Sequence, residues 1–446
     1  MILADAQTAL DFSDPALLSN PFPFYARQRT DAPIALAQGP GGQQFYLVTS
    51  YALIEEASKR ADDFSSQMGH LLMAGGDAAP EVAAILAQDW IDPARLLISD
   101  DPDHKRYRAI VNSVFAQRRI ANMGSTIERI ANELIDDFIE SGECDFVNQF
   151  AVLLPTYIIA DILGLPRDKY ALVRQWSDGI IRIVSRMGTP EQEVAAARMV
   201  LDFRRFIKSM IQARRIKPED DLISLLIAAR VEGMEPLTDD EIAPSAFEIA
   251  VAGNETTRNT LMSGIVQLLA HPDQLQALID DPSLAPGAVE ELLRYETPAT
   301  SMWRVATADT ELGGIAIPQG AALLLRFDAA NRDPAKFANP ESFDIRRRNA
   351  HQHVAFGGFG VHRCLGQMLA RKELAIGFNK LLARLNNLCV LEGSDTGYWP
   401  GLMHRGITSV RLGFDPGPRV FPKQYRTASC QPPSSPKAIA SSRASP

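Results

Sequence analysis

The stretch FGGFGVHRCLG, residues 356–366, decides the fold, because it sets Cys364 in a loop with four glycines. Glycines let the backbone turn its amides inward, and the run that follows, LGQMLARKELAIGFNKLLARL (365–385), has a helical pattern. A buried thiolate needs amide donors aimed at the sulfur and is favoured by a helix N-terminus behind it. The alternative is a glycine-rich turn around a structural cysteine, and it would be preferred for a cysteine without so long a string around it. The string therefore points to a functional thiolate.

Composition narrows the class of protein. Of 446 residues, 46% are hydrophobic and 22% charged, which is ordinary for a soluble globular protein. The four cysteines are far apart and form no CxxC pair, which argues against a disulfide framework or a zinc site. No apolar stretch approaches the roughly 20 residues of a membrane span, and the acidic start of the chain is unlike a signal peptide. A net charge of −9 argues against nucleic acid as the main partner, so we expect a cytoplasmic protein with a small-molecule function.

Helical patterns dominate the chain. Apolar residues recur at three- and four-residue spacing in 50–64, 125–142, 221–230 and 244–272. The last of these is apolar nearly all round in its first half, which predicts a long helix in the middle of a large core. Short strands are predicted within 44–50, 303–327 and 407–414, and the Asn-, Asp-, Pro- and Arg-rich segment 328–355 is predicted to be an irregular meander.

These elements predict one mainly α domain with small β-sheets over residues 20–421. An N-terminal extension, 1–19, precedes it. The Pro/Ser-rich tail, 422–446, has no periodicity, so we expect it to be disordered and assign Cys430 no role.

The string AGNETTRN, 252–259, places polar residues inside the long apolar helix. A buried Glu255 is costly unless it serves chemistry or is well paired, and the hydroxyl of Thr256 can bond back to the preceding turn. A helix kink with satisfied polar groups is an equally good interpretation of this string alone. A second string, EELLRYETPATSMWR (290–304), places Glu291 and Arg294 three residues apart on one helical face, which by itself is an ordinary surface pair.

Residues 356–366 resemble the haem-binding loop of the cytochrome P-450 family, the haem-thiolate monooxygenases. In that family the cysteine is the axial iron ligand, with Gly four residues before it, His or Arg two before and Gly two after. The matching residues here are Gly360, His362, Cys364 and Gly366. The resemblance extends over residues 20–415 and implies a triangular-prism domain whose long central helix lies over a haem b held by Cys364.

One position departs from the family pattern. The aromatic residue seven before the cysteine is replaced by Gly357, and Phe356 stands eight before, so the loop is one residue longer. Either Phe356 or Phe359 could shield the sulfur, and both stay open.

The other strings also match the family. Glu255 and Thr256 correspond to the acid–alcohol pair on the distal side of the haem, where the threonine holds dioxygen and the acid relays protons, while Ala252 and Gly253 leave space. Glu291 and Arg294 correspond to the ExxR pair, which is usually joined by a third basic residue from the meander. That place is Ser342 here, which leaves the third partner open. The candidates are Arg332, Arg346, Arg347 or backbone carbonyls.

The resemblance also implies residues that contact the haem and the substrate. His104 and Arg108, four apart on one helical face, together with Arg304 and His362, would hold the two propionates. The family's pocket-lining segments correspond to 66–99 and 178–190 and to Ile249, Ala252, Gly253, Thr300, Ser301, Met302, Leu402 and Met403. This lining is mostly apolar, so we expect a hydrophobic substrate such as a terpenoid, a steroid or an aromatic or alkyl hydrocarbon.

The reaction implied is hydroxylation of that substrate with O2, two protons and two electrons. No GxGxxG string or cysteine cluster indicates a flavin or iron–sulfur domain, so we expect the electrons to come from a separate acidic ferredoxin with an NAD(P)H-dependent reductase. Basic residues expected on the cysteine side would attract it. They are Lys105, Arg106, Arg118, Arg119, Arg363, Arg371 and Lys372.

Two other functions are compatible with a haem-thiolate site. A peroxide-driven enzyme would not need the Glu255–Thr256 pair, which is present. A haem-binding gas sensor or electron carrier would not need a deep substrate pocket, and a sensor would usually carry an output domain, for which the sequence has no signal.

Overall fold

The computed structural model describes residues 10–12, 14–39, 42–72, 80–89, 95–115, 117–185 and 189–422. Apart from Pro422, the expected tail at 422–446 lies outside these residues. Within them, no helix is both long enough and apolar enough to cross a membrane.

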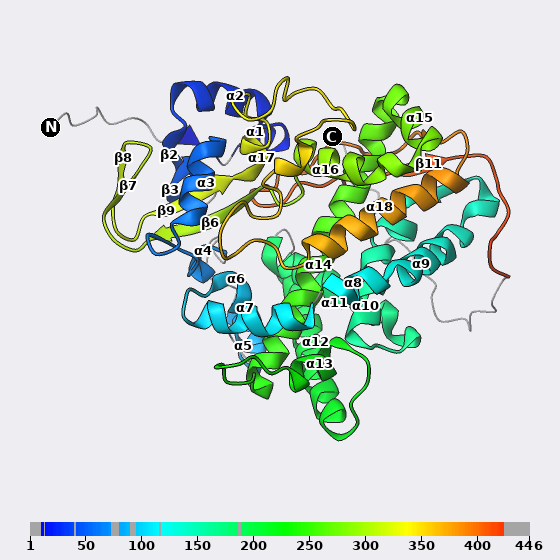
Figure 1. Cartoon of the computed structure of the whole chain (residues 1–446), viewed down its shortest axis with the longest axis horizontal. Helices are drawn as coiled ribbons and strands as arrows, with labels where there is room; N and C mark the ends of the chain where they lie inside the picture. Colours follow the sequence, from blue (N-terminus) through cyan, green and yellow to red (C-terminus); the bar gives the residue numbers. More distant parts are fainter. Residues whose placement is uncertain are drawn as a thin grey trace, which may run out of the picture.

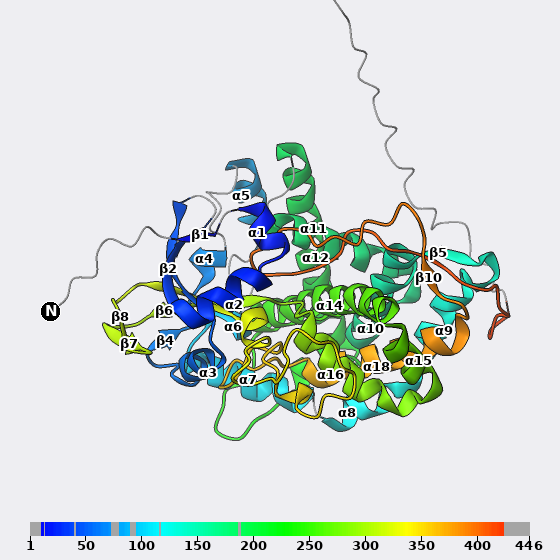
Figure 2. The same ribbon diagram turned by 90° about the horizontal axis from the view of Figure 1, so that it is seen from above.

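Helices form most of the molecule, as predicted (Figure 1). They include α3 (Tyr51–Lys59), α7 (Asp103–Val114), α9 (Gly124–Asp136), α10 (Leu153–Leu163), α11 (Tyr170–Ser185), α12 (Pro190–Ile216), α14 (Asp239–Ala270), α16 (Ala285–Tyr295) and α18 (Gln367–Arg384). Helix α14 runs through the middle, and α10, α12, α16 and α18 pack around it (Figures 1 and 2). The mainly α fold with a long central helix is confirmed.

Helix α14 begins earlier than its apolar pattern indicated. Thr238 and Glu241 form a capping box, in which each side chain accepts from the other residue's backbone N–H. The first turn is acidic (Asp239, Asp240 and Glu241), so it carries no apolar period, and Pro244 is accommodated inside the helix. The cap, and not the hydrophobic run, therefore sets where this helix starts.

A six-stranded sheet lies at one end of the molecule (Figure 2). Its order is β1 (Leu10–Asp11), β2 (Ile34–Gln38), β3 (Gln44–Val48), β9 (Ala322–Arg326), β6 (Ser301–Ala306) and β4 (Phe64–Ser65). Smaller sheets join β10 (Cys389–Val390), β11 (Arg411–Gly413) and β5 (Glu143–Asp145), and β7 (Thr310–Leu312) with β8 (Ile315–Ile317). Part of the expected extension thus belongs to the sheet, since β1 pairs with β2 and Phe12 is fully buried beside it.

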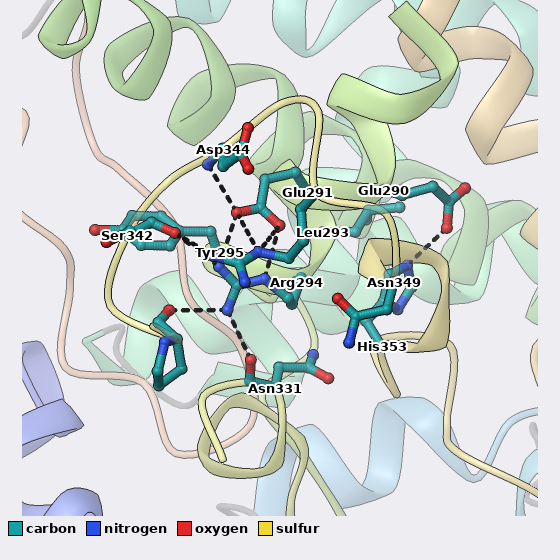
Figure 3. Close-up of polar contacts among 12 residues, drawn as sticks. Glu290, Glu291, Leu293, Arg294, Tyr295, Asn331, Ser342, Asp344, Asn349 and His353 are labelled. Carbon is teal, nitrogen blue, oxygen red and sulfur yellow. Dashed lines mark hydrogen bonds and ion pairs between the residues drawn. The ribbon is translucent and has the colours of Figure 1, made fainter. Parts of the chain in front are cut away.

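The meander predicted at 328–355 has little regular structure, as expected. It contains α17 (Phe327–Ala330), which begins one residue before it, and one 3-10 turn, Ala350–Gln352. Its chain passes beside α16 (Figure 3), and the cysteine loop follows it directly along the sequence.

Candidate functional site

The cysteine loop owes its shape to glycines in the left-handed region. Gly357, Gly358 and Gly360 have φ values of +89°, +72° and +95°. A Cβ on Gly360 would lie 2.3 Å from the carbonyl oxygen of Ser58, near the end of α3, a distance no side chain can accept. The glycine four residues before the cysteine is therefore required twice, for its backbone conformation and for the contact with α3.

Cys364 lies just before the N-terminus of α18. The amides of Gly366 and Gln367 donate to its sulfur. Burial raises the pKa of the Cys364 thiol, whereas these amides and the guanidinium groups of Arg108 and Arg371 act to lower it. These surroundings therefore suit a thiolate whose negative charge is balanced by a bound cation, such as a haem iron.

The structure separates the two phenylalanines that could accompany the sulfur. The carbonyl of Phe356 accepts a hydrogen bond from the Cys364 amide at 2.8 Å, and its ring lies 4.4 Å from the guanidinium of Arg371. The Phe359 ring instead packs on α3, with its centroid 6.0 Å from that of Tyr51. Phe356 is therefore the aromatic residue that stays on the cysteine side.

Basic side chains converge beside the loop. The rings of His104 and His362 lie 4.0 Å apart between centroids, and neither His104 Nε2 nor His362 Nδ1 has a hydrogen-bond partner. His104 Nδ1 is 3.5 Å from Asp101, too far for a good hydrogen bond. Burial, together with the charges of His104 and Arg304, lowers the pKa of His362 to about 3.

Arg304 reinforces this cluster from strand β6. Its side chain is buried, donates to the neighbouring Trp303 carbonyl at 2.7 Å, and has its pKa lowered to about 10 by burial. Asp100 acts on it, but that carboxylate already accepts from Ser65 and Ser66. A buried arginine beside two imidazoles whose ring nitrogens lack hydrogen-bond partners fits a group carrying two carboxylates, so these residues fit the propionates of a haem.

Helix α14 has an open face at Ala252 and Thr256. Ala252 is exposed although the helix crosses the middle of the molecule, and Thr256 is half-buried, with its hydroxyl 3.3 Å from the Ala252 carbonyl. Gly253 faces the other way, because a Cβ there would lie 2.9 Å from Cδ1 of Ile159 on α10. The missing side chain of Gly253 thus makes room for Ile159, and Ala252 is the residue exposed on the open face.

Glu255 is bonded at one oxygen only. Its Oε1 accepts from Arg258 at 2.8 Å and from Asn259 at 3.1 Å, whereas Oε2 is buried without a hydrogen-bond partner. A residue that the motifs did not indicate, His404, lies within range of its charge: burial lowers the pKa of His404, and Glu255 acts to raise it. No local pattern marks His404, because it approaches α14 from a distant turn.

The ExxR pair is completely buried. Arg294 donates to both Glu291 oxygens, at 2.7 and 2.8 Å, and both side chains are 0% exposed (Figure 3). The open third partner is Arg347, whose Nε lies 3.1 Å from each Glu291 oxygen. Backbone carbonyls of Asn331, Pro340 and Ser342 also accept from Arg294, so both alternatives are realised.

The expected substrate residues fall into two groups. Thr300 and Ser301 are buried, and both hydroxyls donate to the Leu402 carbonyl at 3.1 Å, which anchors the turn that carries Leu402 and Met403. Met302, Leu402 and Met403 share one apolar cluster with Met68, Leu71, Leu97 and Ile98. Ile249 is buried in a neighbouring cluster that includes Leu96. Parts of 66–99 and 178–190 lie outside the described residues.

Some of the basic residues expected to attract a redox partner already bind other groups of this chain, and others are exposed. Arg106 pairs with Glu241, and Arg371 pairs with Glu290. The group is completed by Lys372, which donates to the Ala121 carbonyl, by the exposed Lys105 and Arg363, and by Arg118 and Arg119, whose side chains lie outside the described residues. Two apolar side chains, Val361 and Met368, are 45% and 44% exposed on either side of the cysteine.

Comparisons with known proteins agree with this site. The Cytochrome P450 family model matches residues 180–394. The steroid C26-monooxygenase of Mycobacterium tuberculosis (strain CDC 1551 / Oshkosh) is 37% identical over 371 residues, which cover 83% of this chain and 95% of that protein. That of Mycolicibacterium smegmatis is 38% identical over 377 residues, covering 84% and 88%.

Solved structures give the same result. Cytochrome P450 CYP109Q5 from Chondromyces apiculatus superposes with a TM-score of 0.80 at 30% identity, covering 91% of this chain and 98% of that one. CYP109E1 from Bacillus megaterium, in complex with corticosterone, superposes with a TM-score of 0.78 at 28% identity, covering 90% and 100%. The chain therefore belongs to the cytochrome P450 family, whose monooxygenases use a haem iron held by a cysteine thiolate.

Proposed function

We propose that this enzyme hydroxylates a hydrophobic, uncharged small molecule of the steroid or terpenoid kind in the cytoplasm. The observation that carries the proposal concerns the two hydroxyl groups in the expected substrate lining. Those of Thr300 and Ser301 both donate to the Leu402 carbonyl, so they are already bonded within the protein. The side chains that stand beside this turn, Met302 and Met403, are apolar and flexible. Such a lining recognises shape and apolar area, and the relatives named steroid C26-monooxygenases support this substrate class.

The chain's own residues supply binding and proton control. When bound, the haem supplies activation of dioxygen. Thr256 and Ala252 stand on the open face of α14, and the free Oε2 of Glu255 can hold a proton and release it toward that face. A peroxide-driven enzyme would have no use for this pair.

We also propose that a separate acidic ferredoxin delivers the two electrons on the cysteine side. Exposed Arg363 and Lys105 provide positive charge, and the exposed Val361 and Met368 provide apolar contact area beside Cys364. A small patch with an apolar centre and a charged rim is typical of transient electron-transfer contacts.

A spectral binding screen tests the proposed function. Holoenzyme is titrated with steroids, terpenoids, aromatic and alkyl hydrocarbons, and long-chain fatty acids as a charged comparison. Compounds that shift the haem spectrum are then incubated with O2, NAD(P)H and a surrogate ferredoxin pair. We expect uncharged steroids or terpenoids to shift the spectrum and to gain one hydroxyl whose oxygen comes from O2.

The controls separate the alternatives. Shifts by fatty acids alone would overturn the substrate class, and a haem that no apolar compound perturbs would favour a sensor. Product formed from peroxide at the full rate without reductase and ferredoxin would overturn the electron route.

A further inference from the structure

Glu290 is mostly buried beside the cysteine loop, and it does not contact the ExxR partner Arg294. It is the helical neighbour of Glu291 on α16 but points the other way, to His353 and Arg371 (Figure 3 shows the His353 contact). Its Oε2 lies 3.1 Å from His353 Nε2, and its Oε1 accepts from Arg371 Nε at 2.5 Å. The Glu290 side chain is 15% exposed and that of His353 is 1% exposed. The three groups form a largely buried cluster joining α16, the meander and α18.

The backbone determines which nitrogen of His353 carries the proton. The Ala355 amide donates to His353 Nδ1 at 3.1 Å, so that nitrogen is the acceptor and Nε2 carries the hydrogen. Nε2 lies 3.1 Å from Glu290 Oε2 but does not have the alignment of a hydrogen bond. Burial lowers the pKa of His353, which favours the neutral ring. The charge of Glu290 is therefore offset by Arg371 alone.

Arg371 connects Glu290 to the metal-ligand loop. Its guanidinium is held by both Glu290 oxygens, at 2.5 and 3.1 Å, and by Gln367 Oε1 at 3.0 Å. It lies 4.4 Å over the Phe356 ring, and its charge is one of those that act on the Cys364 sulfur. The Phe356 carbonyl in turn accepts from the Cys364 amide. Glu290 thus determines where a positive charge and an aromatic ring lie beside the thiolate.

We propose that Glu290 is a positioning residue that sets the reduction potential of the haem, by holding Arg371 against Phe356 and offsetting its charge near the Cys364 sulfur. A positive charge close to a haem favours the form with one more electron, and a negative charge favours the form with one fewer. The pair is nearly neutral at the sulfur as long as both partners are ionised. Removing either charge alone must therefore move the potential, and the two removals must act in opposite directions.

The experiment is a spectroelectrochemical titration of the holoenzyme, in which ferric haem takes up one electron from the electrode through soluble mediators. Glu290→Gln leaves Arg371 uncompensated and should raise the potential. Arg371→Gln leaves Glu290 uncompensated and should lower it. We expect each change to alter the ferrous-to-ferric ratio at fixed potential about three- to tenfold, which is about 30–60 mV. The double variant should return close to the wild-type value.

The opposite signs distinguish this role from simple loosening of the loop, which would move both single variants in the same direction and would not be repaired in the double variant. The control is Glu128→Gln, which breaks the ion pair with Lys380 further along α18 and should leave the potential unchanged. No ferredoxin or substrate is present, so the result is independent of the proposed function. If Glu290→Gln fails to load haem, Arg371→Gln and the double variant decide: potentials that are equal, or ordered the other way, overturn the proposal.

Discussion

At the scale of single residues, helix α14 has one carboxylate oxygen and one hydroxyl that contribute little to the stability of the fold. A buried oxygen left without a donor costs on the order of 1–3 kcal/mol. Glu255 Oε2 is such an oxygen, while the Thr256 hydroxyl makes only a long bond of 3.3 Å to the Ala252 carbonyl. These two groups contribute little to the stability of the fold, and the unpaired oxygen lowers it. This fits a role in moving protons.

Thr256→Ala should therefore leave the fold and ligand binding intact and impair the use of electrons. We expect normal haem loading and a normal substrate-induced spectral shift, because only one long hydrogen bond is lost. Product formed per NAD(P)H should fall severalfold, with the electrons diverted to peroxide or water. The measurement is the ratio of product to NAD(P)H consumed with a surrogate ferredoxin pair. Thr256→Ser, which restores the hydroxyl, is the control, and equal ratios in the two variants would contradict the proton role.

The sequence indicated those site residues whose partners lie close to them along the chain. Cys364, Glu291 and Arg294 were recognisable because each sits in a short string with its neighbours at fixed spacing. Arg347 was left open among several candidates, since its partner Glu291 is 56 residues away and only the path of the meander brings them together. The approach of Ile159 to Gly253 was not predictable, because a missing side chain gives no sign of which neighbour lies against it.

At the scale of elements, Arg347 ties α16 to the meander. Besides Glu291, it donates to the carbonyls of Ala338, Asn339 and Ser342, and its side chain is only 9% exposed. Arg347→Met should leave the buried Glu291 carboxylate with one cation instead of two. We expect a loss of about 2–4 kcal/mol in the free energy of unfolding, measured by urea denaturation of the holoenzyme.

Its neighbour provides the control for this change. Arg346 is exposed and makes a hydrogen bond only through its backbone among the contacts described, so Arg346→Met should alter stability by no more than about 0.5 kcal/mol. Equal stability of the two variants would show that Arg347 does not complete the ExxR cluster.

Periodicity located the long elements better than the short ones. Helix α14 was found from its apolar run, but its start depends on the Thr238–Glu241 cap, which lies before that run. The predicted strand at 407–414 shrinks to β11, Arg411–Gly413, because a strand ends where its partners end, and β5 and β10 are only three and two residues long. Boundaries that depend on a partner cannot be obtained from one segment alone.

At the scale of the whole molecule, the connections between distant segments were beyond the reach of sequence patterns. The parallel pairing of β3 with β9 joins Tyr46 to Leu323, and β1 adds a segment that we had placed outside the domain. Backbone hydrogen bonds between strands do not depend on which side chains are present, so the sequence does not show which strands pair. The family resemblance supplied the overall fold that the patterns alone could not.

One long-range ion pair gives the molecule an acid-sensitive contact. Arg106 on α7 donates to both oxygens of Glu241 at the start of α14, at 2.8 and 3.1 Å. The hydrogen bonds from Arg106 lower the pKa of Glu241 from 4.5 to about 2, because they outweigh burial, which acts to raise it. A carboxyl whose pKa is lower in the folded state stabilises the fold above its unfolded pKa, and this contribution is lost as the pH falls through the window from about 4.5 to about 2.

Glu241→Gln isolates this contribution, because glutamine keeps the capping box and removes only the charge. We expect the variant to be less stable at pH 7 by about 1 kcal/mol, because solvent screens a pair near the surface, and the difference from the wild type to shrink as the pH is lowered from 5 to 3, as measured by urea unfolding. Glu232→Gln, at an exposed position, should show no such dependence. A difference that stays constant with pH would mean that packing of the side chain, and not its charge, joins α7 to α14.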